Sequence, residues 1–205
     1  MLPGYLAVQA SGFDEVLFRA LNLAGTNPLL DVVMALITSL ALPYILPFLS
    51  LPLWWRGHRE LAFDLLLLLV LVIVVTEILK YAIGRPRPCE ILPDARVLGS
   101  GVCGGESDPA FPSGHASRVF AVAMLLAFRF KGAARPVGFA VAVLVGVSRV
   151  YLGVHWPTDV LGGAVVGIVL AVALELVARR SSSYRNIRGR FIGAVSRAFS
   201  RTSAT

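Results

Sequence analysis

Long apolar runs constrain the fold of this chain more than any other feature of its sequence. About five runs are long enough to cross roughly 30 Å of hydrocarbon as helices, and they cover residues 28–54, 61–81, 113–130, 136–152 and 157–178. Charged residues make up only 15% of the chain, whereas a soluble domain carries about 25%. We therefore expect an all-α fold, a polytopic membrane bundle with about five spanning helices.

Two of these runs carry residues that interrupt a simple membrane span. The first contains Pro43 and Pro47, so we expect it to kink or to end early. The third has Ser117 and Arg118 in its first turns, which indicates that its start faces a polar cavity rather than lipid. No repeat or linker divides the chain. We expect one membrane domain over residues 1–180, with its motifs at 80–159, and a basic tail over 181–205.

Two shorter segments have the pattern of helices that lie in the membrane interface. Residues 12–22 place four apolar side chains on one helical face: Val16, Leu17, Ala20 and Leu21. This pattern predicts an N-terminal interfacial helix on the outer surface, and the alternative is a polar leader. Residues 185–201 place Phe191, Ile192, Val195 and Phe199 on one face, which fits either a helix drawn to anionic lipid or a disordered tail. Residues 1–27 do not resemble a cleavable signal, because acidic residues interrupt any apolar core.

The net charge of +7 indicates how the chain is oriented in the membrane. Basic residues gather at 56–59, at 129–135 and from 179 onward, and these segments share one face if the spans number about five. The positive-inside rule makes that face cytoplasmic. The N-terminus, the loop 84–112 and the turn near His155 then face outside, the C-terminus is cytoplasmic, and the plasma membrane is the expected location. Nucleic acid is not an expected partner, because no motif that reads DNA or RNA is present.

Both cysteines, Cys89 and Cys103, fall in this outer loop. Conditions outside the cell are oxidising, so we favour a disulfide that closes the loop. Two unpaired thiols are the alternative, and an inverted topology would favour them.

Three groups of polar residues stand at the outer ends of the apolar runs. The first group is Lys80, Arg85 and Arg87; the second is Ser113, Gly114 and His115; the third is Ser148, Arg149, His155 and Asp159. In the expected topology all three groups meet at the same face of the membrane. We therefore predict a shared polar site at that face.

The cations of these groups suit a bound phosphate. Lys80, Arg87 and Arg149 supply positive charge for the phosphate oxygens. A helix that starts near Ser113 and Gly114 would also point exposed backbone N–H groups at an anion. These five residues are the predicted phosphate-binding residues.

The remaining polar residues suit nucleophilic catalysis. His155 and Asp159 are four residues apart at a helix start, so Asp159 is close enough to accept the ring proton. An imidazole held in this way presents its other nitrogen as a nucleophile, and His115 is placed to protonate the leaving oxygen as a general acid. We predict His155, His115 and Asp159 as the catalytic residues.

No carboxylates have metal-ligand spacing in this sequence. Asp31, Asp64, Glu77 and Glu175 are scattered along separate runs, so a two-metal mechanism is not expected. Neither a metal nor another cofactor is predicted.

These same residues carry a family resemblance. Lys80, Arg87 and Pro88 match the pattern K-x6-R-P, residues 112–115 read PSGH, and Ser148, Arg149, His155 and Asp159 match S-R-x5-H-x3-D. In this order the chain resembles the type 2 phosphatidic acid phosphatase family, which also includes soluble vanadium haloperoxidases.

The resemblance implies a fold, a mechanism and roles for the motif residues. The implied fold is a six-helix core that includes the first helix, and the implied mechanism is metal-independent hydrolysis through a phosphohistidine on His155. By motif position, the resemblance assigns phosphate binding to Lys80, Arg87, Ser113, Gly114 and Arg149, and the acid role to His115.

A lipid phosphatase is the favoured function. Phosphatidate, phosphatidylglycerol phosphate and a polyprenyl diphosphate are the candidate substrates, and neither an obligate protein partner nor nucleic acid is inferred. Three alternatives remain: a phosphotransferase with the same intermediate, a silent membrane scaffold or transporter, and a haloperoxidase. Arg85 fits either phosphate or lipid headgroups equally well, and Arg118 fits a pocket-lining or paired role that is not catalytic.

Overall fold

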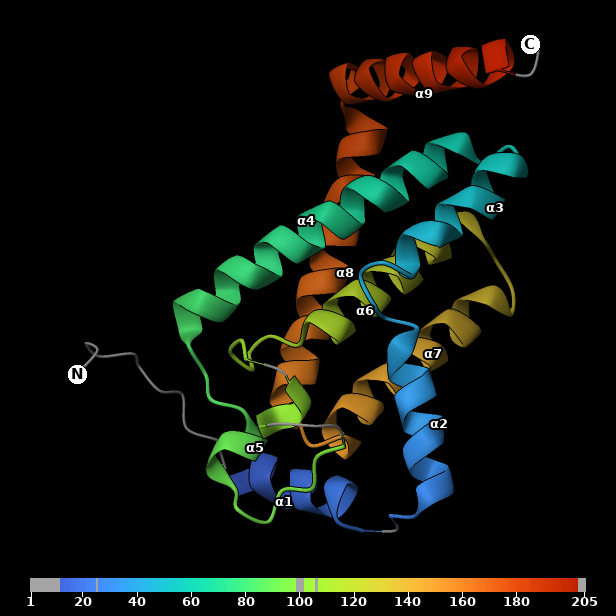
Figure 1. Cartoon of the computed structure of the whole chain (residues 1–205). Coiled ribbons are helices and arrows are strands. Elements are labelled where there is room, and N and C mark those ends of the chain that lie inside the picture. The colour runs from blue at the N-terminus through green and yellow to red at the C-terminus, as the bar shows by residue number, and fades with distance from the viewer. Residues whose placement is uncertain (1–11, 25, 99–101, 106, 203–205) are drawn as a thin grey trace.

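The computed structural model describes residues 12–24, 26–98, 102–105 and 107–202, and side chains as far as residue 198. The expectations for residues 1–11 and for the side chain of Phe199 lie outside this part of the chain. Every regular element in it is a helix, which confirms the all-α prediction (Figure 1).

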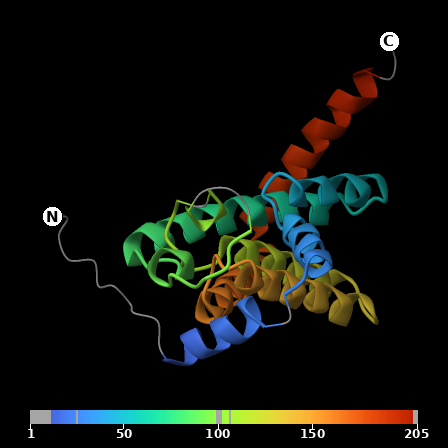
Figure 2. The same cartoon turned by 60° about the horizontal axis from the view of Figure 1, so that its bottom comes forward.

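The helices follow one another with short connections. They are α1 (Gly12–Asn22), α2 (Pro28–Ser39), η1 (Leu46–Leu49), α3 (Ser50–Trp55), α4 (Arg59–Ile83), α5 (Pro88–Ile91), η2 (Val102–Gly105), α6 (Gly114–Arg129), α7 (Ala134–Tyr151), α8 (Pro157–Arg180) and α9 (Ser182–Thr202). In Figure 1, α1 and α5 lie at one end of the bundle and α9 lies at the other, and Figure 2 shows the same separation from a second side.

Three stretches are long and apolar enough to cross a membrane: Arg59–Ile91, Ala134–Tyr151 and Pro157–Arg180. The run 28–54 is divided into α2, η1 and α3, as expected of a segment with Pro43 and Pro47, because proline removes a helical hydrogen bond. Helix α6 has 16 residues, slightly fewer than the 17 or so that a perpendicular span needs. The integral-membrane class is confirmed, and about five spans stays a prediction.

Helices α6 and α8 pack with their backbones in close contact. A Cβ atom at Gly163 would lie 2.5 Å from the carbonyl oxygen of Ser113, and one at Gly167 would lie 2.9 Å from the amide nitrogen of Ala121. Glycines spaced four apart allow helices to approach this closely in membranes. The start of α8 is therefore held beside the start of α6. Around this pair, Leu65 and Leu68 of α4 join the main buried cluster.

Helix α1 forms over the residues predicted for an interfacial helix, but a different face of it packs. Its buried residues are Asp14, Phe18 and Asn22, whereas Val16, assigned to the apolar face, is 71% exposed. The ring of Phe18 packs against Trp156 with centroids 5.4 Å apart. Contacts with the turn between α7 and α8 select the buried side of α1 and leave Val16 on the outside of the bundle, so the apolar face expected for the membrane interface stays a prediction.

Helix α9 occupies the segment for which a helix and a disordered tail were both open. Arg188 of α9 is 5% exposed, and its guanidinium contacts Asp64 of α4 at 2.7 Å. Tyr184 donates its hydroxyl to the same carboxylate at 2.5 Å, and Phe191 packs against Phe63. Helix α9 is therefore attached to the start of α4.

Candidate active site

The predicted site residues come together at the end of the bundle that holds α1 and α5. Lys80 lies in the last turn of α4, Arg87 precedes α5, Ser113 precedes α6, and Arg149 lies in the last turn of α7. The side chain of His155, in the turn between α7 and α8, is under the electrostatic influence of Arg87, Arg149, Lys80 and His115. The three groups that were predicted to meet are thus neighbours.

His155 lies between a carboxylate and a guanidinium. Its Nδ1 is 3.5 Å from Oδ2 of Asp159, which is beyond a good hydrogen bond, and this Nδ1 has no hydrogen-bond partner among the residues that the structure describes. On the other side of the ring, Nε2 is 3.4 Å from Nη1 of Arg87. Catalytic hydrogen bonds are often long before substrate binds, so this arrangement suits an Nε2 that faces the site and an Nδ1 that faces Asp159.

Burial and positive charge keep His155 neutral. The side chain is 1% exposed, and burial, followed by the charge of Arg87, lowers its pKa well below the ordinary 6.5. A neutral imidazole retains the lone pair that a nucleophile requires.

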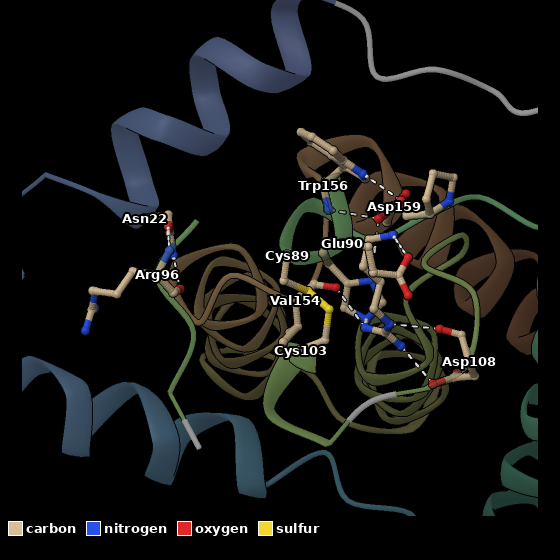
Figure 3. The surroundings of a disulfide bond; sticks show 12 residues. Asn22, Cys89, Glu90, Arg96, Cys103, Asp108, Val154, Trp156 and Asp159 are labelled. Carbon is tan, nitrogen blue, oxygen red and sulfur yellow. Dashed lines mark hydrogen bonds and ion pairs between the residues drawn. A yellow bond between two sulfur atoms is a disulfide. The ribbon is translucent and has the colours of Figure 1, made fainter. Parts of the chain in front are cut away.

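The carboxylate of Asp159 is fixed from two directions. Its Oδ2 accepts the backbone N–H of Trp156 at 2.8 Å, and its Oδ1 accepts Nη1 of Arg85 at 2.6 Å. Figure 3 shows Trp156 and Asp159 in this arrangement. The first turn of α8 therefore has a rigid carboxylate beside the histidine.

Arg85 pairs with two carboxylates, whereas the sequence suggested phosphate or lipid headgroups as its partner. Its Nη2 donates to Oδ2 of Asp14 at 2.6 Å, and its Nη1 also contacts Oγ1 of Thr158 at 2.7 Å. Asp14 in turn accepts the backbone N–H of Thr158 at 3.0 Å. Asp14 was missed because an acidic residue in the first turn of an amphipathic helix ordinarily faces water and stabilises the helix N-terminus.

A second carboxylate that sequence reasoning missed lies among the predicted phosphate-binding cations. Asp108 forms an ion pair with Lys80, and its Oδ1 accepts Nη2 of Arg87 at 2.8 Å. Arg87 also donates to the backbone oxygens of Asp108 and Val154, each at 2.8 Å (Figure 3). The side chain of Asp108 is 25% exposed. The only signal in the sequence was its position in the loop between two motifs.

The start of α6 differs in one respect from the predicted anion site. The backbone N–H of Ser113 donates to the carbonyl oxygen of Asp159 at 3.0 Å, so this N–H is not directed at an anion. The Ser113 hydroxyl accepts from the N–H of Ala116 at 3.5 Å, as a helix N-cap does. Gly114 and His115 follow in the first turn, where His115 is under the influence of Arg149, Arg118, Lys80 and Arg87.

Two further arginines connect this region to α2 and the segment after it. Arg149 donates to Oγ1 of Thr38 at 3.1 Å, and Arg118 donates to the carbonyl oxygen of Ala41 at 2.8 Å. Arg118 thus has a backbone partner, in keeping with a role that is not catalytic.

A disulfide joins α5 to η2 beside the site. Cys89 and Cys103 are bonded with their Cα atoms 5.3 Å apart, and Figure 3 shows the bond between the segments that carry Arg96 and Asp108. The disulfide closes the loop that precedes Asp108.

Two carboxylates of the apolar helices have basic partners. Asp31 pairs with Arg96 at 2.9 Å, and Glu175 pairs with Arg129 at 2.7 Å. Within the described part of the chain, no three His, Cys, Asp or Glu side chains gather as a metal site would require.

Comparisons with known proteins agree with the motif resemblance. The family model for the PAP2 superfamily matches residues 61–182. An undecaprenyl-diphosphatase of Sulfolobus acidocaldarius is 31% identical, over 78% of this chain and 75% of that protein. Phosphatidylglycerophosphatase B of Bacillus subtilis is 34% identical, over 80% of this chain and 81% of that protein.

Two solved structures have a similar fold. The crystal structure of Aquifex aeolicus LpxE has a TM-score of 0.68 at 30% identity, over 82% of this chain and 98% of that one. The crystal structure of a transmembrane PAP2 type phosphatidylglycerolphosphate phosphatase from Bacillus subtilis has a TM-score of 0.70 at 30% identity, over 83% and 86%.

Proposed function

This chain belongs to the PAP2 superfamily, and on that basis we propose that it is a membrane enzyme that hydrolyses a phosphate monoester or diphosphate on a lipid. The observation that carries the proposal is the position of His155. Its Nε2 faces the guanidinium of Arg87 at 3.4 Å, and its Nδ1 faces the carboxylate of Asp159 at 3.5 Å. A nucleophile, a group that orients it and a cation for the phosphate are thus adjacent.

The first chemical step transfers the phosphoryl group to His155. Nε2 attacks phosphorus, an N–P bond forms, and the P–O bond to the lipid breaks. His115 donates a proton to the departing lipid oxygen. The positive charge that develops on the imidazole is stabilised through Nδ1–H by Asp159, as in other oriented histidines.

The second step releases phosphate. Water attacks the phosphohistidine, His115 accepts a proton from that water, and cleavage of the N–P bond returns His155 to its neutral form. Negative charge on the phosphoryl oxygens is balanced in both steps by Lys80, Arg87 and Arg149. Ser113 and Gly114 complete the proposed phosphate-binding set. No step in this scheme uses a metal or another cofactor.

Lipid substrates are supported by the helices that carry the site and by what the relatives act on. The similar proteins include enzymes named for undecaprenyl diphosphate, phosphatidylglycerophosphate and lipid A. Phosphatidate, phosphatidylglycerol phosphate and a polyprenyl diphosphate are therefore the substrates to test.

We also propose the orientation of the protein in a plasma membrane. The site and the Cys89–Cys103 disulfide lie at one end of the bundle, whereas α9, with its arginines, lies at the other (Figure 1). The positive-inside rule favours a cytoplasmic α9 and C-terminus. The site would then open on the extracytoplasmic side, where disulfides persist.

The experiment is phosphate release by the detergent-purified protein in excess EDTA. Wild type, His155→Ala and His58→Ala are compared on the three candidate lipids. His58 is the matched control, because it lies in the link before α4 and its ring packs against Phe130. We expect release by wild type and His58→Ala, and a loss of at least about a thousandfold in His155→Ala, as for removal of a catalytic nucleophile.

Each other result has a definite meaning. Release that continues in folded His155→Ala removes His155 as nucleophile. Release that requires a divalent metal removes the metal-independent scheme. Transfer of labelled phosphate to an added acceptor in place of water supports a phosphotransferase, and no turnover by folded wild type supports a silent scaffold.

A further inference from the structure

A buried chain of charged groups connects α1 to the proposed nucleophile. It runs from Asp14 of α1 through Arg85, in the segment after α4, to Asp159 at the start of α8. Arg85 contacts Asp14 and Asp159 at 2.6 Å each, and Asp159 lies beside His155. The exposed fractions of Asp14, Arg85 and Asp159 are 1%, 3% and 0%.

Burial makes these contacts energetically important. A charge removed from water costs several kcal/mol unless ion pairs and hydrogen bonds compensate for it. One guanidinium here serves two carboxylates, and Asp14 accepts further hydrogen bonds from the backbone and hydroxyl of Thr158 at 3.0 and 2.6 Å. Asp14 therefore fixes both Arg85 and the first turn of α8.

The geometry divides the two oxygens of Asp159 between two tasks. Oδ1 is taken by Arg85, which sets the rotation of the carboxylate. Oδ2 is left to the backbone of Trp156 and to Nδ1 of His155. Without Arg85, the carboxylate would be free to rotate, and without Asp14, Arg85 would have Asp159 as its one carboxylate partner and would draw it away from the ring.

We infer that Asp14 and Arg85 are positioning residues for the His155–Asp159 pair, so that α1 contributes directly to the active site. The inference rests on the proposed function, in which His155 accepts the phosphoryl group. Neither residue touches the phosphate. Both act by holding Oδ2 of Asp159 where it stabilises the imidazolium that forms during transfer.

The test uses full-length Asp14→Asn, which keeps the shape of the side chain and removes its charge. Glu15→Gln is the matched control, because Glu15 is the next residue of α1 and pairs with the partly exposed Arg19. Turnover of a lipid phosphate is measured in excess EDTA and is divided by the number of sites that form a phosphohistidine. If Asp14 had a merely structural role, its substitution would lower the fraction of folded protein, and this division removes that effect from the measured turnover.

We expect Asp14→Asn to lower kcat per active site by about 10- to 100-fold, the loss that follows removal of groups that orient a histidine in metal sites. The KM and the inhibition constant of inorganic phosphate should stay within about twofold of wild type, because Lys80, Arg87 and Arg149 keep their positions. Glu15→Gln should match wild type. Arg85→Lys provides a second test, since an ammonium keeps the charge but cannot span two carboxylates in the same way.

Two results would overturn the inference. One is a kcat per active site in Asp14→Asn and Arg85→Lys within about twofold of wild type. The other is a loss that appears entirely in phosphate affinity. If wild type shows no turnover that depends on His155, the proposed function fails and the inference fails with it; if wild type turns over and the variants match it, the inference alone fails.

Discussion

Asp108 provides the most direct test of where the phosphate binds. Its carboxylate contacts Lys80 and Arg87, two of the proposed phosphate-binding residues. A phosphate that uses these cations must displace the carboxylate, so Asp108 competes with substrate and product. Substitution of Asp108 by Asn should therefore strengthen the binding of phosphate.

The size of the effect follows from the contacts that the substitution removes. Asparagine can keep its carbonyl oxygen on Arg87, but the amide nitrogen that replaces Oδ2 cannot accept from Lys80. One charge-assisted hydrogen bond, worth about 1.5–3 kcal/mol, is then lost from the resting state. The side chain is 25% exposed, so water recovers part of this energy, and about 1.4 kcal/mol, or tenfold in affinity, remains.

The assay is the inhibition constant of inorganic phosphate against turnover of a lipid phosphate. Asp108→Asn should lower this constant about tenfold. The matched control is Asp94→Asn, which removes a 43% exposed carboxylate that pairs with Arg19 in the same loop region. An inhibition constant that is unchanged or higher in Asp108→Asn would refute the reasoning, because it would mean that phosphate does not take the place of this carboxylate.

Three further predictions concern stability. Gly167→Ala should cost about 1–3 kcal/mol, because its Cβ would meet the backbone of α6, whereas Gly189→Ala in α9, where a Cβ meets nothing within 4 Å, should be neutral or stabilising in the same detergent melts. The folded-state pKa of His155 is lowered, so on acidification the unfolded chain takes up this proton before the folded chain does. The free energy of unfolding should therefore fall below about pH 6.5, by up to 1.4 kcal/mol per pH unit. An equal slope of unfolding free energy against pH in wild type and His155→Gln, between about pH 7.5 and 5.5, would contradict this. Replacement of Cys89 and Cys103 by serine should lower the free energy of unfolding by about 2–4 kcal/mol, and unchanged melts would exclude a stabilising disulfide.

The apolar runs predicted the helical fold, and the motif spacings predicted that the motif residues gather at one end of the bundle. An apolar run must be helical in lipid, because its backbone groups have no other partners. Motif residues at the ends of such runs are then constrained to the ends of the bundle. The position of His155 and Lys80 at the same end of the bundle follows from where they stand relative to the apolar runs, so it could be predicted from the sequence.

Residues whose role depends on a distant partner could not be found in this way. Asp14 is buried because it meets Arg85, 71 positions further along the chain, and no periodicity within α1 records that contact. Asp108 is a single carboxylate in a loop, and its partner Lys80 is 28 positions away. The backbone N–H of Ser113 was expected to face an anion. Because α6 packs closely on α8, this N–H instead donates to the backbone carbonyl oxygen of Asp159.

The attachment of α9 has a practical consequence for anyone who shortens or tags this protein. Arg188 and Tyr184 are direct partners of Asp64, a carboxylate that is 1% exposed inside α4. A chain cut after α8 would remove both partners and leave Arg129, at 4.0 Å, as the cation paired with that carboxylate. A purification tag is therefore better fused beyond residue 202 than substituted for the last helix, and a version that lacks α9 should need more stabilising detergents to remain folded.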